Sequence, residues 1–209
     1  MDVMAKPSVR ERLLNAAVEA VRQRGYNACG VQDITDAAGV PKGSFYNHFD
    51  SKEALGAAIV EQYWQRGACS SLRVLSDESL PPIERLRRYF GTLAANMADC
   101  DYKSGCLIGN LSAELADQSR LVCDRLSAIY AGWTRSIETC LREAQDAGEI
   151  RADRDPAVLA GFLLNAWEGA MLRAKVDKDG AAYRQFQEIV FGVLLGRACA
   201  PDEVRQDLS

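Results

Sequence analysis

Apolar residues recur at spacings of three and four along almost the whole chain, and this helical period is the feature that most constrains the fold. No segment of useful length alternates apolar and polar residues as a half-buried strand would, and the chain has only 6 prolines. With 209 residues, it is long enough for one large domain or two small ones. The sequence therefore predicts an all-α protein that buries roughly 70% of its unfolded surface without disulfide support.

Composition excludes several classes of protein. The longest apolar stretch, residues 157–164, is interrupted only by Gly161 and is far shorter than the ~20 residues of a membrane-spanning helix. Charged residues recur from Asp2 to Arg24, so we expect no secretory signal, a cytoplasmic location and no membrane partner. The net charge of −4 excludes a globally basic nucleic-acid binder, but it leaves room for a local DNA-binding surface.

The sequence offers little for metal or enzyme chemistry. Its 7 cysteines form no Cys-x-x-Cys pair and its single histidine gives no zinc spacing, so we expect neither a metal nor a cofactor. Disulfides are not expected in a reducing cytosol, and most of the cysteines should be small buried apolar residues. An all-α enzyme is the competing interpretation, but we find no nucleophile–base constellation and no glycine-rich phosphate loop.

Two short predicted helices, residues 31–38 and 42–49, are separated by Ala38-Gly39-Val40, as in a helix-turn-helix. Phe45 and Phe49 lie at positions i and i+4 of the second helix and should point into a small core. The side chains left outside carry hydrogen-bond donors and no acid: Lys42, Ser44, Tyr46, Asn47 and His48. Lys42, Ser44 and Tyr46 suit phosphates, and Asn47 suits a base edge, which predicts a DNA-binding domain over residues 1–55.

Residues 31–55, VQDITDAAGVPKGSFYNHFDSKEAL, resemble the DNA-binding signature of the TetR family of bacterial repressors, and the match extends over about residues 9–60. The resemblance implies that residues 42–49 form a recognition helix in the major groove. It implies phosphate contacts by Tyr46, His48 and Lys52 and further contacts at Gln32, Thr35 and Lys42. It also implies a homodimer that binds double-stranded operator DNA and leaves it when the C-terminal helices bind a small-molecule inducer.

The remaining chain predicts a helical ligand-binding and dimerisation domain over residues 56–200 and a polar tail over residues 201–209. Apolar stripes on the last two predicted helices, residues 156–176 and 181–199, indicate an interface, and the resemblance implies a four-helix bundle there. We expect the following stripe residues at this interface: Phe162, Ala166, Phe186, Ile189, Val190, Val193 and Leu194. The candidates for the inducer pocket are Trp133, Trp167 and Met171.

One cysteine has an unusual setting in the sequence. Ser104 is a good N-cap and would place Cys106 in the first turn of a helix. The helix dipole and the neighbouring Lys103 would favour a thiolate there. Asn110 lies one turn further on, among small residues that could line a cavity. The sequence therefore predicts that Cys106 is the most reactive of the thiols.

Residues 103–115, together with residues 167–170 and 173–175, resemble the NemR/AcuR-like branch of TetR repressors. The resemblance implies that Cys106 is a sensor thiol, that Lys175 is its neighbour in the fold, and that the inducer is a reactive electrophile or an acrylate-like compound. A structural cysteine and an ordinary non-covalent apolar inducer are the alternatives that the residues leave open.

Overall fold

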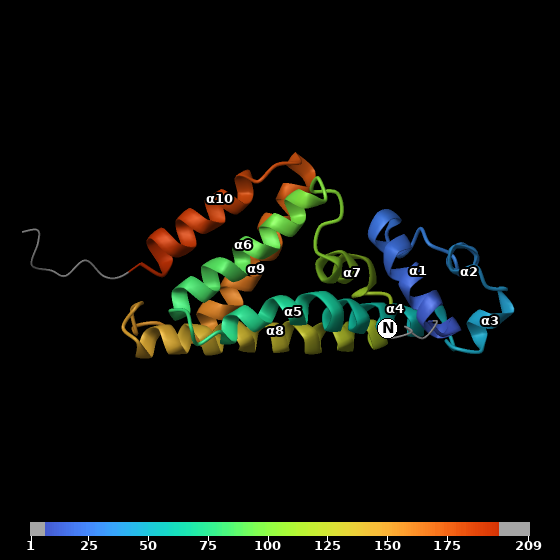
Figure 1. The fold of residues 1–209 in the computed structure, drawn as a ribbon, viewed down its shortest axis with the longest axis horizontal. Helices are drawn as coiled ribbons and strands as arrows, with labels where there is room; N and C mark the ends of the chain where they lie inside the picture. The colour runs from blue at the N-terminus through green and yellow to red at the C-terminus, as the bar shows by residue number, and fades with distance from the viewer. Residues whose placement is uncertain (1–6, 197–209) are drawn as a thin grey trace, which may run out of the picture. The chain divides into compact units, whose positions relative to one another are not determined.

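The computed structural model describes residues 7–196, apart from the side chains of residues 68–70, and contains only helices and their connections in that range (Figure 1). This confirms the predicted all-α fold. The helices are α1 (Val9–Arg24), α2 (Val31–Ala38), α3 (Gly43–Tyr46), α4 (Lys52–Tyr63), α5 (Cys69–Leu72), α6 (Pro82–Asp99), α7 (Leu107–Leu115), α8 (Arg120–Asp146), α9 (Pro156–Asp177) and α10 (Ala181–Gln187). Segments of π-helix lie at Trp64–Ala68 and Glu188–Leu194, and a 3-10 helix lies at Arg73–Ser76. None of the described helices combines the length and apolar character that a bilayer crossing requires.

Local capping chemistry sets where the first helices begin and end. Ser8 and Glu11 form a capping box at the start of α1, with the Ser8 amide 2.8 Å from the Glu11 carboxylate. Gly39 ends α2 in the left-handed conformation, at φ 64°. At the start of α4, the Ser51 hydroxyl accepts a hydrogen bond from the amide of Ala54 at 3.0 Å. The observed extent of α2, residues 31–38, is the extent that the sequence predicts.

The recognition helix is shorter than its predicted range of residues 42–49. Helix α3 ends at Tyr46, because the Phe45 carbonyl accepts from the amides of both His48 and Phe49 and tightens the chain into a turn. The residues that follow α3 therefore lie in a compact turn that leads to the Ser51 cap.

The chain forms two compact units. One comprises the residues up to Ser70 together with Cys100–Ala131, and the other comprises Ser71–Asp99 together with the residues from Gly132 onward. The helix-turn-helix therefore shares its unit with α7 and with the first part of α8. We call this first body the DNA-binding unit, after the DNA-binding domain that the sequence predicts within it, and the other one the second unit.

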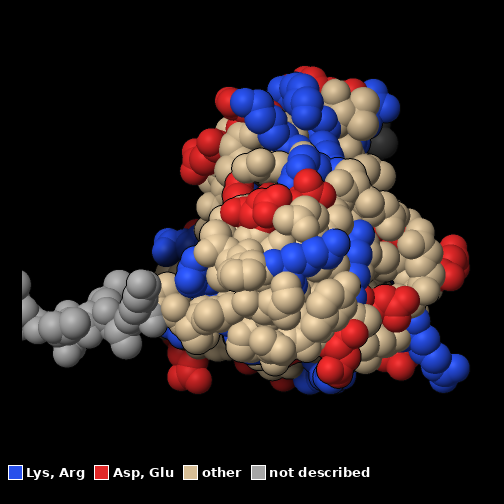
Figure 2. All heavy atoms as spheres, turned by 90° about the vertical axis from the view of Figure 1, so that its right-hand side faces the viewer, with Lys and Arg blue, Asp and Glu red and all other residues tan. Residues whose placement is uncertain are grey.

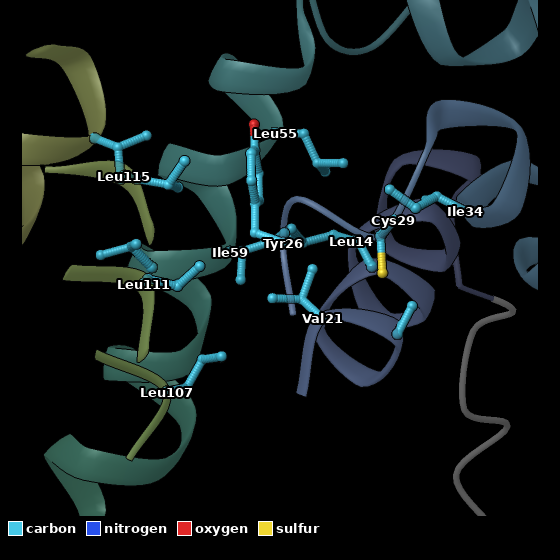
Figure 3. Packing of buried hydrophobic residues seen from close by; sticks show 14 of the residues in the cluster. Leu14, Val21, Tyr26, Cys29, Ile34, Leu55, Ile59, Leu107, Leu111 and Leu115 are labelled. Carbon is cyan, nitrogen blue, oxygen red and sulfur yellow. The ribbon is translucent and has the colours of Figure 1, made fainter. Parts of the chain in front are cut away.

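The core of the DNA-binding unit joins segments that lie far apart in the sequence. Figure 3 shows Leu107, Leu111 and Leu115 of α7 facing Leu55 and Ile59 of α4, with apolar residues of α1 and α2 beyond them. All five side chains are at most 2% exposed. The amphipathic α7 thus buries its apolar face against the helices that support the helix-turn-helix.

The second unit has an aromatic core. Trp167 of α9 is fully buried, with its ring centroid 5.3 Å from that of Phe90 and 5.6 Å from that of Phe186. The guanidinium of the buried Arg85 lies 2.5 Å from the Glu143 carboxylate, which joins α6 to α8 inside this unit. Because a buried cation needs a partner, this ion pair constrains how the two helices pack.

We expect Leu111→Ala to lower the free energy of unfolding by about 2–5 kcal/mol, since it leaves a cavity in the core of the DNA-binding unit. Urea denaturation followed by circular dichroism measures the change. Leu121→Ala is the matched control, because Leu121 is 45% exposed and its truncation should cost less than about 1 kcal/mol. Equal losses in the two variants would show that α7 is not part of this core.

Candidate nucleic-acid interface

Two phenylalanines anchor the recognition segment, residues 42–49. Phe45 is 0% exposed and Phe49 is 5% exposed, and their ring centroids lie 5.6 Å apart. The Arg10 guanidinium lies 5.2 Å from the centroid of the Phe49 ring, a cation–π arrangement that closes the core from the α1 side. Both phenylalanines are core residues, as predicted.

The opposite face of this segment is accessible. Lys42, Tyr46, Asn47 and His48 are exposed, Ser44 is half-buried, and Tyr46 remains 59% exposed. No acidic side chain lies between Lys42 and Phe49. A Cβ at Gly43 would meet nothing within 4 Å, so no neighbour in the protein requires a glycine there. Without a side chain at Gly43, the backbone at the start of α3 is directly accessible from outside. The face can approach a DNA backbone closely.

The two residues predicted on α2 differ in their accessibility. Gln32 is exposed, with its side-chain amide 2.7 Å from the Asp36 carboxylate. Thr35 is 0% exposed, and its hydroxyl donates to the Gln32 carbonyl at 3.0 Å. The prediction for Thr35 is therefore corrected: its hydroxyl is consumed inside α2, because the residue points toward the core and not outward.

The turn of the helix-turn-helix is held by a residue that the sequence analysis missed. Arg12 of α1 donates to the carbonyls of Ala38 and Gly39 at 2.6 and 2.8 Å. These carbonyls lie at the C-terminal end of α2, where backbone carbonyls have no hydrogen-bond donor within the helix. The sequence shows a cation in the first turn of α1, but nothing in it indicates which carbonyls this side chain reaches.

Lys52, another predicted phosphate contact, is half-buried at the start of α4. Its ammonium lies 2.9 Å from the Tyr26 carbonyl and 4.3 Å from the centroid of the Tyr26 ring. The Tyr26 hydroxyl in turn donates to the Lys52 carbonyl at 2.8 Å. Burial, assisted by the charge of Glu53, raises the pKa of Tyr26 to about 12, so this hydroxyl stays protonated as the donor.

Charge on this side of the molecule is mixed. Figure 2 shows basic side chains interleaved with acidic ones rather than one continuous basic surface. The acid-free stretch between Lys42 and Phe49 is therefore a local feature within a balanced field. Contacts to DNA would depend on these few donors more than on long-range attraction.

The setting of Cys106 differs from its prediction. Helix α7 begins at Leu107 with Cys106 at the N-cap, so the cysteine precedes the first turn and Ser104 does not cap the helix. Gly105 is left-handed at φ 66° and delays the start, while the Ser104 carbonyl accepts from the Asn110 side chain at 2.8 Å. Lys103 pairs with Asp101 at 2.9 Å, and this partner raises the pKa of Lys103.

Cys106 is half-buried and packs against the core of the DNA-binding unit. Asn110 belongs to the same unit. The other inducer-site candidates belong to the second unit, namely Trp133, Trp167, Met171 and Lys175. Both tryptophans and Met171 are at most 3% exposed, and Lys175 is half-buried. Within the second unit, Trp167 packs edge-on against Tyr183, which was not among the candidates.

Exposed apolar residues form a stripe along α9 and the segment after α10, which we call the apolar stripe: Val158, Phe162, Leu172, Val176, Ile189 and Val193. Three of them, Phe162, Ile189 and Val193, were predicted. Phe186 and Val190 are at most 6% exposed, and their assignment to a surface is corrected because they fill the core of the second unit. Ala166 and Leu194 are half-buried. Each missed member lies four residues from another member of the stripe: Val158 from Phe162, and Leu172 from Val176.

A helix-turn-helix with an anchored core face and an acid-free outer face defines a DNA-binding transcriptional regulator. Residues 13–59 match the family of bacterial regulatory proteins described as the tetR family, and residues 82–190 match the tetracyclin repressor-like C-terminal domain. The chain belongs to the TetR family. It is accordingly a transcriptional regulator and not an enzyme.

Several relatives align with most of the chain. The chain is 40% identical over 192 residues to the transcriptional repressor DhaR of a Mycobacterium species, covering 92% of this chain and 95% of DhaR. It is 38% identical over 167 residues to the regulator AcuR of Cereibacter sphaeroides, covering 80% and 76%. It is 30% identical over 183 residues to the repressor NemR of Escherichia coli, covering 86% and 90%.

Solved structures agree with these matches. The regulatory protein TetR from Rhodobacter sphaeroides superposes with a TM-score of 0.80 at 36% identity, covering 86% of this chain and 95% of that one. The reduced form of Escherichia coli NemR superposes with a TM-score of 0.79 at 26% identity, covering 89% and 97%. The helical fold of this chain is thus shared along nearly its whole length.

We expect Tyr46→Phe to weaken DNA binding about fivefold, because it removes one hydroxyl and leaves the ring in place. Lys42→Ala should weaken binding to operator and unrelated DNA alike and flatten the dependence of log affinity on log salt by about one unit. Fluorescence anisotropy over a salt series measures both effects.

The matched control is Arg154→Ala, which removes one exposed cation from the second unit. It should leave the salt slope unchanged. Wild-type affinity and slope in folded Tyr46→Phe and Lys42→Ala proteins would place the DNA contacts elsewhere.

Proposed function

We propose that the chain is a ligand-responsive repressor that binds operator DNA as a homodimer and is released by a small molecule. The observation that carries the proposal is the accessible, acid-free face of residues 42–49 on a buried phenylalanine anchor. Membership of the TetR family supports it, as do relatives named as repressors.

In this proposal the outer residues divide the work of recognition. Lys42, Ser44, Tyr46, His48 and Lys52 contact phosphates and fix the register of the protein on the duplex. Asn47 and Gln32 carry amides that can pair with base edges in the major groove. Sequencing of the DNA fragments that the protein selects from its own genome would supply the operator, and absence of any selected fragment would contradict the proposal.

The apolar stripe supports a homodimer. Its members are 53–72% exposed, and a run of large apolar side chains along paired helices is unusual on a monomer. A second copy of the same stripe would bury it in a four-helix bundle. Dimerisation would also place two recognition helices on successive major grooves, about 34–36 Å apart.

Phe162→Glu combined with Val193→Glu should therefore give a monomer that binds operator DNA at least tenfold more weakly, because one helix-turn-helix makes too few contacts. Analytical ultracentrifugation and anisotropy measure the two effects. The control is Leu121→Glu, which adds a charge at an exposed apolar site of the DNA-binding unit. A double variant that sediments as a dimer would locate the interface elsewhere.

We further propose that the inducer acts through Cys106, as a reactive electrophile or an acrylate-like compound. Relatives include AcuR and NemR, and the cysteine lies at the N-cap of α7, where backbone amides favour an anion. The alternative is a non-covalent apolar inducer held by residues such as Trp133, Trp167 and Met171.

Cys106 should label faster with a maleimide than the buried Cys29 and Cys140, as followed by mass spectrometry. Burial raises the pKa of Cys140 to about 12, which keeps that thiol protonated and slow near neutral pH. Cys100 is exposed and supplies a reference for labelling by access alone. Electrophile-driven release of operator DNA should disappear in Cys106→Ser and persist in Cys100→Ser.

If Cys106→Ser protein is still released by the electrophile, the sensor role is wrong. Release by an apolar compound that does not modify the protein would then favour the non-covalent pocket.

A further inference from the structure

A carboxylate from outside the helix-turn-helix holds the turn between α1 and α2. Glu114 of α7 accepts hydrogen bonds from the backbone amides of Tyr26 and Asn27, at 3.1 and 2.8 Å. Both bonds are charge-assisted, and the two amides are separated from Glu114 by more than eighty residues of sequence. The turn is therefore positioned by α7 as well as by its own helices.

Two glycines make this packing close. Gly25 has φ +84°, and a Cβ there would lie 3.0 Å from the Glu114 carboxylate. Gly56 of α4 faces the Tyr26 ring, and a Cβ there would also lie 3.0 Å from that ring. Tyr26 is consequently enclosed, with 5% of its surface exposed, and has little freedom to move independently of its neighbours.

Tyr26 connects this turn to Lys52. Its carbonyl receives the Lys52 ammonium, its ring faces the same ammonium, and its hydroxyl donates to the Lys52 carbonyl. Lys52 is the first residue of α4, directly after the recognition segment and the Ser51 cap. One continuous set of hydrogen bonds thus runs from Glu114 through Tyr26 to Lys52, entirely inside the DNA-binding unit.

We propose that Glu114 is a positioning residue through which α7 sets the affinity for operator DNA. Its carboxylate holds Tyr26, and Tyr26 holds Lys52 where the ammonium can reach a phosphate. A ligand or modification that displaces α7 withdraws the carboxylate, frees Tyr26 and removes the Lys52 contact. This inference rests on the proposed contact between Lys52 and DNA.

The sign of the effect separates this role from general electrostatics. Glu114→Gln removes a negative charge, which by itself strengthens attraction to DNA. If Glu114 positions Lys52, the same change weakens binding. The amides of Tyr26 and Asn27 donate to different carboxylate oxygens, and glutamine replaces one of these acceptors with an NH₂ group that can only donate. Asp117→Asn, just beyond the end of α7, is the matched control, since it removes the same charge at an exposed site.

The experiment measures operator affinity over a salt series for the full-length protein and four variants: Glu114→Gln, Lys52→Ala, their combination and Asp117→Asn. We expect Glu114→Gln to lose at least about fivefold in affinity and up to about one unit of salt slope per displaced Lys52. The double variant should bind no more than about twofold worse than Lys52→Ala, because both changes remove one contact. Asp117→Asn should bind as well as the wild type or better.

Hydrogen exchange gives a second measurement. The amides of Tyr26 and Asn27 should exchange faster in Glu114→Gln, and a purely structural Glu114 would show this without any change of salt slope. If Glu114→Gln fails to fold, Tyr26→Phe tests the same connection, because it removes the hydroxyl and keeps the two amides that Glu114 binds. It should lose affinity and slope in the same direction.

Unchanged or increased affinity in folded Glu114→Gln would overturn the proposal, as would losses that multiply in the double variant. If Lys52→Ala still weakens binding in that case, the proposed contact between Lys52 and DNA stands and only the role of Glu114 is wrong. Wild-type affinity and slope in Lys52→Ala would instead overturn both the contact and the inference built on it.

Discussion

Burial of Phe45 is the interaction on which the accessible face of residues 42–49 depends. Helix α3 has 4 residues, too few to persist in water, so its conformation comes from tertiary packing and not from helix propensity. Phe45 and Phe49 supply that packing, and Arg12 satisfies the carbonyls of the adjoining turn. Every exposed side chain of the recognition segment is oriented by these buried neighbours. A change that destabilises this core therefore also disturbs the orientation of the exposed side chains.

Features encoded by local spacing could be predicted from the sequence. The helical period, the extent of α2 and the inward phenylalanines all depend on residues within a few positions of one another. Thr35 was predicted as a DNA contact but is buried. Helix α2 has only 8 residues, so its apolar pattern is too short to show on which face each residue lies. The start of α7 was misplaced because Gly105 adopts a left-handed conformation that an N-cap pattern does not reveal.

Features that join distant segments could not be predicted. The bond between Glu114 and Tyr26 spans 88 residues, and a lone glutamate on a predicted helix carries no mark of its partner. The last two helices are apolar on more than one face, so their sequence does not show which face turns inward. The structure resolves this ambiguity by burying Phe186 and Val190 and exposing Ile189 and Val193.

The interleaved charges of Figure 2 bear on how a regulator of this kind finds its site in a genome. Random DNA is bound almost entirely through phosphate neutralisation, and a surface of balanced charge releases few counterions there. Occupancy of the target depends on the ratio of the two affinities, because competing sites in a genome are very numerous. With little broad electrostatic attraction to add to both affinities, each contact from the recognition segment has a large share in that ratio.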